Sequence, residues 1–227
     1  MKIEKTFVKS KFDKIVRRYD LVNLVGSFGR DKYWRKRVAE LLDGCEPPIL
    51  DLCCGPFTLT LELSRRHRVK FWALDFSFQM LHYVRSRIVD KPIAPVCGDA
   101  EQLPFKSETF GAITIAFGFR NLPNREKALS EFFRVLKPRG RLIILEFSWP
   151  KNFLFQRIYK LYLDLYMPFL GGLLTGDKQA YEYLADSIKA FPPPEKVKSM
   201  LEKEGFREVF YTPLTMGIVY IYKAVKP

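Results

Sequence analysis

The sequence predicts an α/β fold built on a mainly parallel sheet. Short apolar runs alternate with helical stretches through residues 48–147, as parallel strands and their crossover helices do. Three successive runs lead directly to an acidic residue, at nearly equal spacing: Asp51, Asp75 and Asp99. With 227 residues, the chain is long enough for one domain with a buried core.

The N-terminal part is predicted to be helical. Phe12, Ile15, Val16 and Tyr19 recur at helical spacing, so the first helix carries an apolar face opposite a basic one. A second helix is expected over 31–42, ending near a glycine.

Five apolar runs mark the parallel strands of the predicted sheet: 48–52, 70–74, 93–97, 110–117 and 141–147. Helices are expected between them because right-handed crossovers join parallel strands. We therefore expect a helix after the first strand, although Leu59, Leu61 and Leu63 alternate like a strand. A helix over 77–89 has Ser77 as a favourable N-cap, and another over 125–136 stops at a Lys-Pro-Arg-Gly segment.

The strand–helix alternation stops after residue 150. An aromatic helical stretch over 153–170 and a helix over 179–188 indicate an inserted lid. A helix ending at Gly205 follows, and strands at 208–212 and 217–225 predict an antiparallel hairpin at the sheet edge. The expected single domain over 1–227 divides into an N-terminal helical cap (1–45), a cofactor-binding core (46–149), a helical lid insertion (150–192) and a closing helix with strands (193–227).

The composition excludes several classes of protein. Hydrophobic residues make up 48% and charged residues 28%, and no apolar run has the length of a membrane span or an export signal. Four cysteines without a C-x-x-C pair indicate reduced thiols and a cytoplasmic protein. Two histidines fifteen residues apart argue against a zinc site or a serine–histidine hydrolase, so no metal is expected.

The positive charge is concentrated near the N-terminus. The net charge is +13, and residues 1–40 hold twelve lysines and arginines against five acidic residues. Such a basic segment fits a nucleic acid, an anionic membrane surface or a solvated helix face, and the charge pattern leaves all three open.

The turn after the first strand reads Asp-Leu-Cys-Cys-Gly-Pro-Phe-Thr, which is neither a P-loop nor a dinucleotide fingerprint. With Gly55 as its one glycine, this turn is poorly suited to a pyrophosphate. It suits a cofactor without phosphates, and S-adenosylmethionine fits. Asp75 stands at the ribose position of Rossmann-like sheets, and Asp99 beside Ala100 could accept from the adenine amino group. Each aspartate alone reads better as a cap or turn residue, but the three in register favour the cofactor.

The sequence resembles the UbiE/MenG C-methyltransferases of ubiquinone and menaquinone biosynthesis nearly from end to end. Two segments carry the resemblance most specifically: Phe-Gly-Phe-Arg-Asn at 117–121 and Tyr-x-Tyr-Leu-x-x-Ser-Ile at 181–188. It implies a class I methyltransferase fold with a seven-stranded sheet. It also implies methyl transfer from S-adenosylmethionine to a ring carbon of a prenylated quinol, either demethylmenaquinol or its ubiquinone-pathway counterpart.

The resemblance also implies roles for individual residues. The expected cofactor-binding positions are Asp51, Gly55, Pro56, Asp75, Asp99, Ala100 and Ala116. Arg120 is expected to stabilise a phenolate, with Asn121 and Tyr19 orienting the ring hydroxyl and a base acting through water. The structural alternatives are that Arg120 pairs with a carboxylate, Asn121 caps a helix and Tyr19 belongs to an apolar stripe.

Pro56 and Phe57 depart from the Gly-Thr-Gly-Asp of the family. Pro56 lacks a donor N–H, and the Phe57 ring stands where backbone normally meets the methionine moiety. We hypothesise that the cofactor affinity is weakened or the loop re-routed, and a catalytically silent relative is one alternative. Another is a methyltransferase acting on RNA or on a different small molecule. No nucleic acid is expected, because the Asn/Asp-Pro-Pro-aromatic turn of base-methylating enzymes is missing after the fourth strand.

The aromatic lid has two interpretations. Its rings either pack on the sheet or line an access route for an isoprenoid tail, aided by a basic N-terminal helix on an anionic membrane. The expected location is the cytoplasm, with peripheral contact at the inner face of the membrane. The oligomeric state stays open, a homodimer included.

Overall fold

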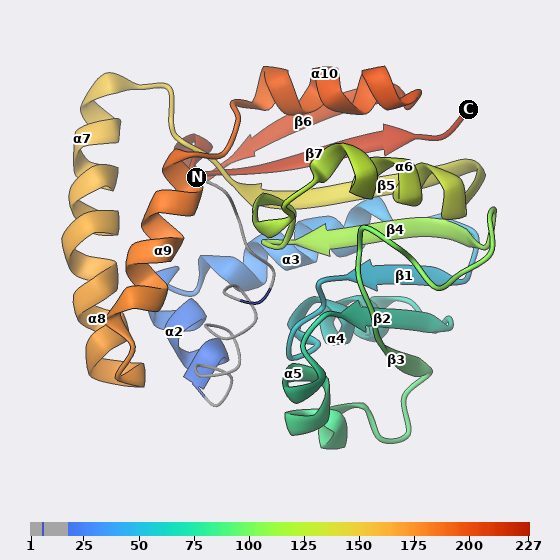
Figure 1. Cartoon of the computed structure of the whole chain (residues 1–227), viewed down its shortest axis with the longest axis horizontal. Helices are drawn as coiled ribbons and strands as arrows, with labels where there is room; N and C mark the ends of the chain where they lie inside the picture. Colours follow the sequence, from blue (N-terminus) through green and yellow to red (C-terminus); the bar gives the residue numbers. More distant parts are fainter. Residues whose placement is uncertain (1–5, 7–17) are drawn as a thin grey trace.

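The computed structural model describes Thr6 and residues 18–227 of the chain (Figure 1). The first expected helix therefore lies almost entirely outside the described residues. The described chain continues in α2 (Tyr19–Gly26) and α3 (Arg30–Leu41), the second of which matches the helix expected at 31–42.

The seven strands form one sheet in the order β3-β2-β1-β4-β5-β7-β6. They are β1 (Ile49–Leu52), β2 (Phe71–Asp75), β3 (Ile93–Cys97), β4 (Phe110–Ala116), β5 (Leu136–Phe147), β6 (Arg207–Leu214) and β7 (Val219–Val225). β1 to β5 run parallel, whereas β7 pairs antiparallel with both β5 and β6. The predicted fold class, a mainly parallel seven-stranded sheet with an antiparallel C-terminal edge hairpin, is confirmed.

Helices cover both faces of this sheet. The remaining α-helices are α4 (Thr58–Arg66), α5 (Phe78–Tyr83), α6 (Arg125–Val135), α7 (Phe153–Leu161), α8 (Met167–Thr175), α9 (Lys178–Lys189) and α10 (Pro194–Glu204). Alternate strand residues point to opposite faces: Leu50 packs in the core that contains residues of α6 and α10, and Ile49 in the core that contains residues of α3, α4 and α5.

The helix expected after the first strand is confirmed as α4. Leu59 and Leu63 are both buried, because residues four apart lie on the same face of a helix. The helix expected over 77–89 is shorter. α5 is capped by Ser77, whose Oγ accepts from the backbone N–H of Met80, but Val84 leaves the helical conformation and a 3₁₀ turn follows at Arg85–Ile88.

The start of β5 also differs from the prediction. The strand begins at Leu136 instead of residue 141, and the Lys-Pro-Arg-Gly segment forms an irregularity within it, where Arg139 has a φ of 63° and the register with β4 shifts. Leu136 pairs with Phe110 of β4, and the backbone N–H of Arg139 donates to the carbonyl of Lys226 beyond β7. The segment that ends α6 therefore also begins the strand.

The lid, defined here as residues 153–189, lies at one end of the sheet. α7 continues through a π-helical turn (Tyr162–Tyr166) into α8, and α9 packs against them. The arrowheads of β1, β2 and β4 point toward the end of the sheet where α2 and the lid lie (Figure 1). This is the end at which open α/β sheets bind their ligands.

Candidate active site

Asp75 ties the turn after β1 to the end of β2. Its carboxylate accepts from the backbone N–H groups of Gly55 and Ser77, each at 2.8 Å. Gly55 has a φ of 51°, a conformation that glycine adopts without steric cost, and an added Cβ would meet nothing within 4 Å there. The turn is thus held close to Asp75 while leaving open space beside Gly55.

A cavity of about 110 Å³ lies at the carboxyl ends of the parallel strands. We call it the polar cavity after the carboxylates of Asp75 and Asp99 that line it, although most of its wall is apolar. It brings together most of the predicted cofactor positions: Gly55, Asp75, Asp99, Ala100 and Ala116. One carboxylate oxygen of Asp99 accepts from the backbone N–H of Glu101 at 2.9 Å, which fixes the side chain at the rim of the turn.

Asp51, Pro56 and Phe57 are not among the residues that line either of the two cavities described here. The Asp51 carboxylate is buried and accepts from the hydroxyls of Thr60 at 2.5 Å and Thr114 at 2.8 Å. Burial raises its pKa from 3.8 to about 6, an effect that the two hydroxyls oppose. The Asp51 side chain therefore links β1 to α4 and β4 through these two hydrogen bonds. Its contact with a cofactor stays a prediction.

Phe57 is fully buried in the core that lies under α3 and α4. Its φ of 60° turns the backbone into the left-handed region at the start of α4. The ring therefore does not fill the polar cavity, although the effect of Pro56 and Phe57 on cofactor affinity stays a prediction.

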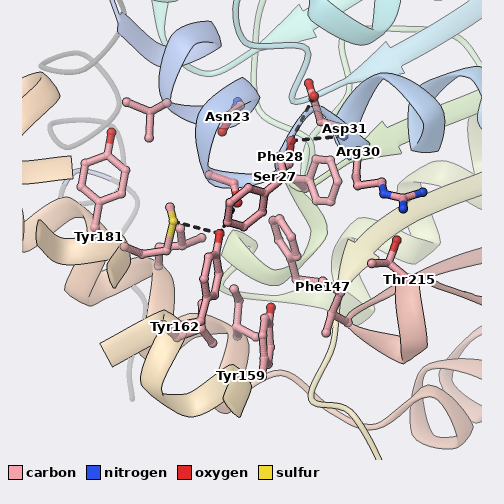
Figure 2. A pocket seen from close by; sticks show the side chains of 18 of the residues that line it. Asn23, Ser27, Phe28, Arg30, Asp31, Phe147, Tyr159, Tyr162, Tyr181 and Thr215 are labelled. Carbon is pink, nitrogen blue, oxygen red and sulfur yellow. Dashed lines mark hydrogen bonds between the residues drawn. The ribbon is translucent and has the colours of Figure 1, made fainter. Parts of the chain in front are cut away.

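A second, larger cavity of about 360 Å³ lies between α2, α3, the lid and the ends of β4 and β5. We call it the apolar cavity. Figure 2 shows Asn23, Ser27 and Asp31 on one side of it and Tyr159, Tyr162 and Tyr181 of the lid on the other. Burial raises the pKa of Tyr159 and Tyr162 above the usual range, so both phenols stay protonated.

Phe117 lines both cavities. Its φ of 58° turns the chain at the end of β4, and its ring stacks on that of Phe147, with centroids 4.4 Å apart. The following residues diverge, since Arg120 lines the apolar cavity and Asn121 the polar one. The segment 117–121 is therefore the wall that the two cavities share.

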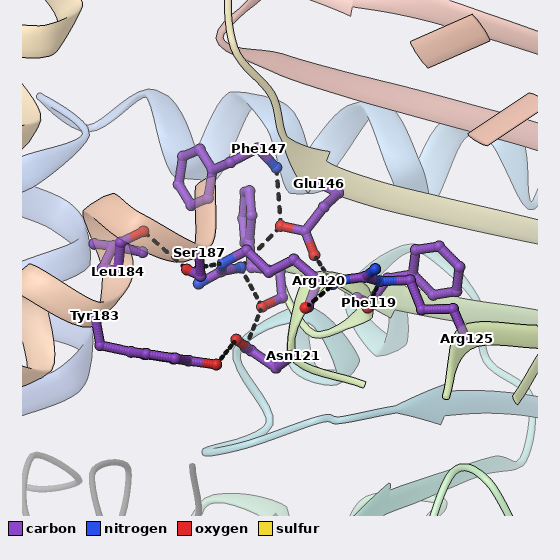
Figure 3. Close-up of polar contacts among 10 residues, drawn as sticks. Phe119, Arg120, Asn121, Arg125, Glu146, Phe147, Tyr183, Leu184 and Ser187 are labelled. Carbon is purple, nitrogen blue, oxygen red and sulfur yellow. Dashed lines mark hydrogen bonds and ion pairs between the residues drawn. The ribbon is translucent and has the colours of Figure 1, made fainter. Parts of the chain in front are cut away.

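Arg120 is buried and pairs with Glu146, with Nη1 and Oε1 2.8 Å apart (Figure 3). Its guanidinium also donates to the carbonyl of Phe117 and to Ser187 Oγ. Arg120 therefore pairs with a carboxylate, as the structural alternative from the sequence expected. It also lines the apolar cavity. Its contact with a substrate stays a prediction.

Asn121 does not cap the next helix, because Asn124 accepts from Lys127 at the start of α6. The Asn121 side chain accepts from the Tyr183 hydroxyl at 3.0 Å (Figure 3). Tyr19 begins α2, but its side chain lies outside what the structure describes. Its catalytic assignment stays a prediction.

Sequence reasoning missed Glu146 and Tyr183 as parts of this site. An acidic residue closing the apolar run Leu-Ile-Ile-Leu at the end of β5 is a usable signal for Glu146, of the same kind that singled out the three aspartates. Tyr183 closes no strand, so the only signal for it is the Tyr-x-Tyr-Leu-x-x-Ser-Ile motif that carries the family resemblance; its contact with Asn121 is made across 62 residues. Among the described residues, no cluster of three histidine, cysteine or acidic side chains could hold a metal ion.

The fold has clear counterparts among solved structures. A SAM-dependent methyltransferase from Thermotoga maritima superposes with a TM-score of 0.68 at 19% identity, covering 97% of this chain and 100% of that one. Another, from Aquifex aeolicus, gives 0.61 at 18% identity, covering 92% and 98%. The fold is that of the class I SAM-dependent methyltransferases.

Residues 1–226 match the ubiE/COQ5 methyltransferase family, and this chain belongs to that family. It is 42% identical over 214 residues to the demethylmenaquinone methyltransferase of Thermotoga maritima, covering 93% of this chain and 92% of the relative. The protein of the same name from Thermus thermophilus is 42% identical over 220 residues, covering 95% and 100%. The resemblance found in the sequence is therefore confirmed, and the protein is a methyltransferase.

Proposed function

We propose that this protein methylates a ring carbon of a prenylated quinol, with demethylmenaquinol as the first substrate to test and the ubiquinone precursor as the second. The observation that carries the proposal is the shared wall at 117–121, which separates a cavity lined by the carboxylates of Asp75 and Asp99 from a larger one lined by many aromatic and aliphatic side chains. A polar cofactor in the first cavity and a hydrophobic ring substrate in the second can thus come into contact at the segment 117–121.

The polar cavity has the groups that S-adenosylmethionine requires. Asp75 stands where a carboxylate binds ribose hydroxyls, Asp99 is offered to the adenine amino group, and Gly55 allows close backbone approach. When bound, the cofactor supplies a methyl group already activated on a sulfonium. The protein must then align that group with the ring carbon and exclude water.

The apolar cavity supplies the remaining requirements. The ring carbon becomes a stronger nucleophile when the neighbouring phenol loses its proton, and the Arg120 guanidinium is a buried donor for the resulting oxyanion. Asn121 lines the polar cavity and is held by Tyr183 of the apolar cavity, so we assign it to orient the ring hydroxyl where the two cavities meet. Since Tyr159 and Tyr162 stay protonated, we assign the proton to a base acting through water.

Radiolabelled methyl transfer tests this function. The protein is incubated with labelled S-adenosylmethionine and demethylmenaquinol, the ubiquinone precursor or RNA, and the product is identified by mass spectrometry. We expect label on the quinol ring carbon and none on RNA. Calorimetric titration with S-adenosylmethionine distinguishes an active enzyme from the catalytically silent alternative. A protein that binds no S-adenosylmethionine would contradict the proposal.

We also propose peripheral contact with an anionic membrane at the inner face of the cytoplasmic membrane. The outer face of the long helix α7–α8 carries an apolar stripe, each of whose side chains is more than half exposed: Leu154, Ile158, Leu161, Leu165, Phe169 and Leu173. Phe28, also exposed, lines the apolar cavity together with Ile158, so the cavity opens beside the stripe. The net charge of +13 favours an anionic surface. Among the described residues, no helix is long and apolar enough to cross a membrane.

Vesicle flotation tests the membrane contact. We expect binding to phosphatidylglycerol vesicles and a loss of about tenfold or more in the Leu161→Asp/Leu165→Asp variant, because each leucine loses its apolar burial. Phe210→Asp, at an equally exposed ring on β6, is the matched control. Unchanged flotation of the double variant would contradict the proposal, and a fall in molecular mass in solution would assign the stripe to a homodimer instead.

A further inference from the structure

The apolar cavity contains a second buried ion pair, at the start of α3. Arg35 Nη1 lies 2.7 Å from Asp31 Oδ2, and both residues line the cavity. The Arg35 and Asp31 side chains are only 5% and 10% exposed. The hydrogen bonds of this pair involve neither the cofactor positions nor the Arg120 cluster, although the charge of Arg35 opposes the rise in the pKa of Asp51.

Asp31 is itself held in place. Its other carboxylate oxygen accepts from Ser27 Oγ at 3.1 Å, and its backbone N–H donates to the same hydroxyl at 3.2 Å (Figure 2). Since a fixed carboxylate fixes the guanidinium paired with it, the orientation of Arg35 in the cavity is set by the end of α2 and the first turn of α3.

Arg35 has a donor without an acceptor. Its Nε–H is buried and has no hydrogen-bond partner among the residues that the structure describes. An unsatisfied buried donor is costly, and such groups in native proteins call for an explanation. In a cavity wall that is otherwise mostly apolar, a bound oxygen atom is the natural acceptor.

Arg35 and Arg120 stand beside the same pair of stacked rings. The Arg35 guanidinium lies 5.5 Å from the centre of the Phe117 ring, and the Arg120 guanidinium 5.4 Å from that of Phe147. Each cation is neutralised by its own carboxylate, Asp31 or Glu146. The apolar cavity therefore presents two separate, directional donor groups to one ligand.

We propose that Arg35 is a positioning residue that donates its Nε–H to the ring oxygen on the far side from Arg120. The inference rests on the proposed function, because a quinol carries two oxygens at opposite positions of its ring. Arg120 serves the oxygen beside the reacting carbon, and Arg35 holds the para oxygen. With both oxygens bound, the ring keeps one orientation in its plane, and the site prefers a dihydroxy ring to a monohydroxy one.

The test compares two substrates in the full-length enzyme. One is the prenylated quinol, and the other is an analogue that keeps the hydroxyl beside the reacting carbon but lacks the para hydroxyl. For Arg35→Gln we expect KM for the quinol to rise about 10- to 100-fold, as loss of a hydrogen bond from a charged donor would cause. KM for the analogue and the Kd of S-adenosylhomocysteine should stay within about twofold, so the preference for the quinol is lost.

Two further variants separate positioning from folding. Arg35→Lys keeps a cation beside Asp31 but lacks the Nε–H, so it should retain the fold and still lose the preference; it decides the question if Arg35→Gln does not fold. Arg37→Gln is the matched control, since Arg37 pairs with Glu40 on the exposed side of the same helix. An equal loss for both substrates, or no change for either, would overturn the inference. Wild-type enzyme that methylates neither substrate would instead refute the proposed function.

Discussion

Arg120 and Glu146 form an ion pair at the end of β4 and β5 that is almost closed to solvent, with side chains 5% and 0% exposed. Glu146 also accepts from the backbone N–H groups of Arg120 and Phe147, each at 2.9 Å. The carboxylate therefore fixes the turn after β4 and neutralises the guanidinium. Arg120 faces the apolar cavity as a directional donor whose charge is already balanced.

The first prediction concerns what Arg120→Ala removes. We expect kcat to fall at least about 100-fold, as loss of an oxyanion donor does, while calorimetry shows nearly unchanged cofactor binding. We also expect the free energy of unfolding to fall by about 3–5 kcal/mol, because Glu146 is left as an unpaired buried charge. Chemical denaturation measures the second effect.

A double variant separates the two effects of Arg120. Arg120→Met/Glu146→Gln removes both charges and keeps an acceptor for the backbone N–H groups, so it should regain most of the stability and none of the turnover. Recovery of turnover along with stability would mean that Arg120 has only a structural role. Loss of cofactor binding in Arg120→Ala would point the same way.

The second prediction separates the roles of Asp75 and Asp99. If Asp99 accepts from the adenine amino group, Asp99→Asn should weaken S-adenosylhomocysteine binding about tenfold and leave binding of the inosine analogue, which lacks that amino group, unchanged. Asp75→Asn should weaken both ligands equally, since the two share the ribose. Calorimetric titration of both ligands measures this, and equal losses in the Asp99 variant would refute the adenine assignment.

The third prediction uses two glycines that line the polar cavity. A Cβ at Gly118 would lie 2.4 Å from Cβ of Cys53, so the turn after β1 and the turn after β4 would have to separate. At Gly98 the closest atom would be Cδ1 of Leu74 at 3.0 Å, the end of a side chain that can rotate away. We expect Gly118→Ala to abolish measurable cofactor binding and Gly98→Ala to retain it within about tenfold. Similar affinities in the two variants would contradict this account of the cavity.

How much the sequence could predict depends on whether a signal is local. Strand ends and their acidic residues are local, so the order of elements and the convergence of Asp75 and Asp99 on one cavity followed from the pattern, whereas Ala116 was implied by the family resemblance. The position of α4 required the crossover argument, because the alternation of its leucines favours a strand.

Side-chain direction and long-range pairing could not be read in this way. Phe57 enters the core because its backbone adopts a left-handed conformation, which the identity of the residue does not reveal. Asp51 turns toward Thr60 and Thr114, hydroxyls that belong to two other elements. Arg35 lies in a sequence segment that reads as part of a basic surface, yet tertiary packing buries it in the apolar cavity.

The last prediction concerns the pH dependence that Asp51 gives to the fold. Its pKa of about 6 in the folded protein lies above the ordinary 3.8, chiefly because the carboxylate is buried. Between about pH 4 and pH 6 the native state therefore binds more protons than the unfolded chain, and the stability contributed by this group is lost as pH rises through about 6.

Asp51→Asn keeps the shape of the side chain, but the amide cannot ionise. The stability of this variant should therefore lack the pH dependence that Asp51 contributes to the wild type. Chemical denaturation at pH 4 and at pH 7.5 gives the free energy of unfolding of the variant minus that of the wild type. We expect this difference to be up to about 3 kcal/mol more positive at pH 7.5, because only the wild type loses stability as pH rises. Thr60 and Thr114 can still bond to the amide, and the cofactor affinity of the variant shows whether Asp51 acts only through these two hydrogen bonds. A difference in stability that is the same at both pH values would mean that Asp51 does not hold a proton in the folded protein in this range.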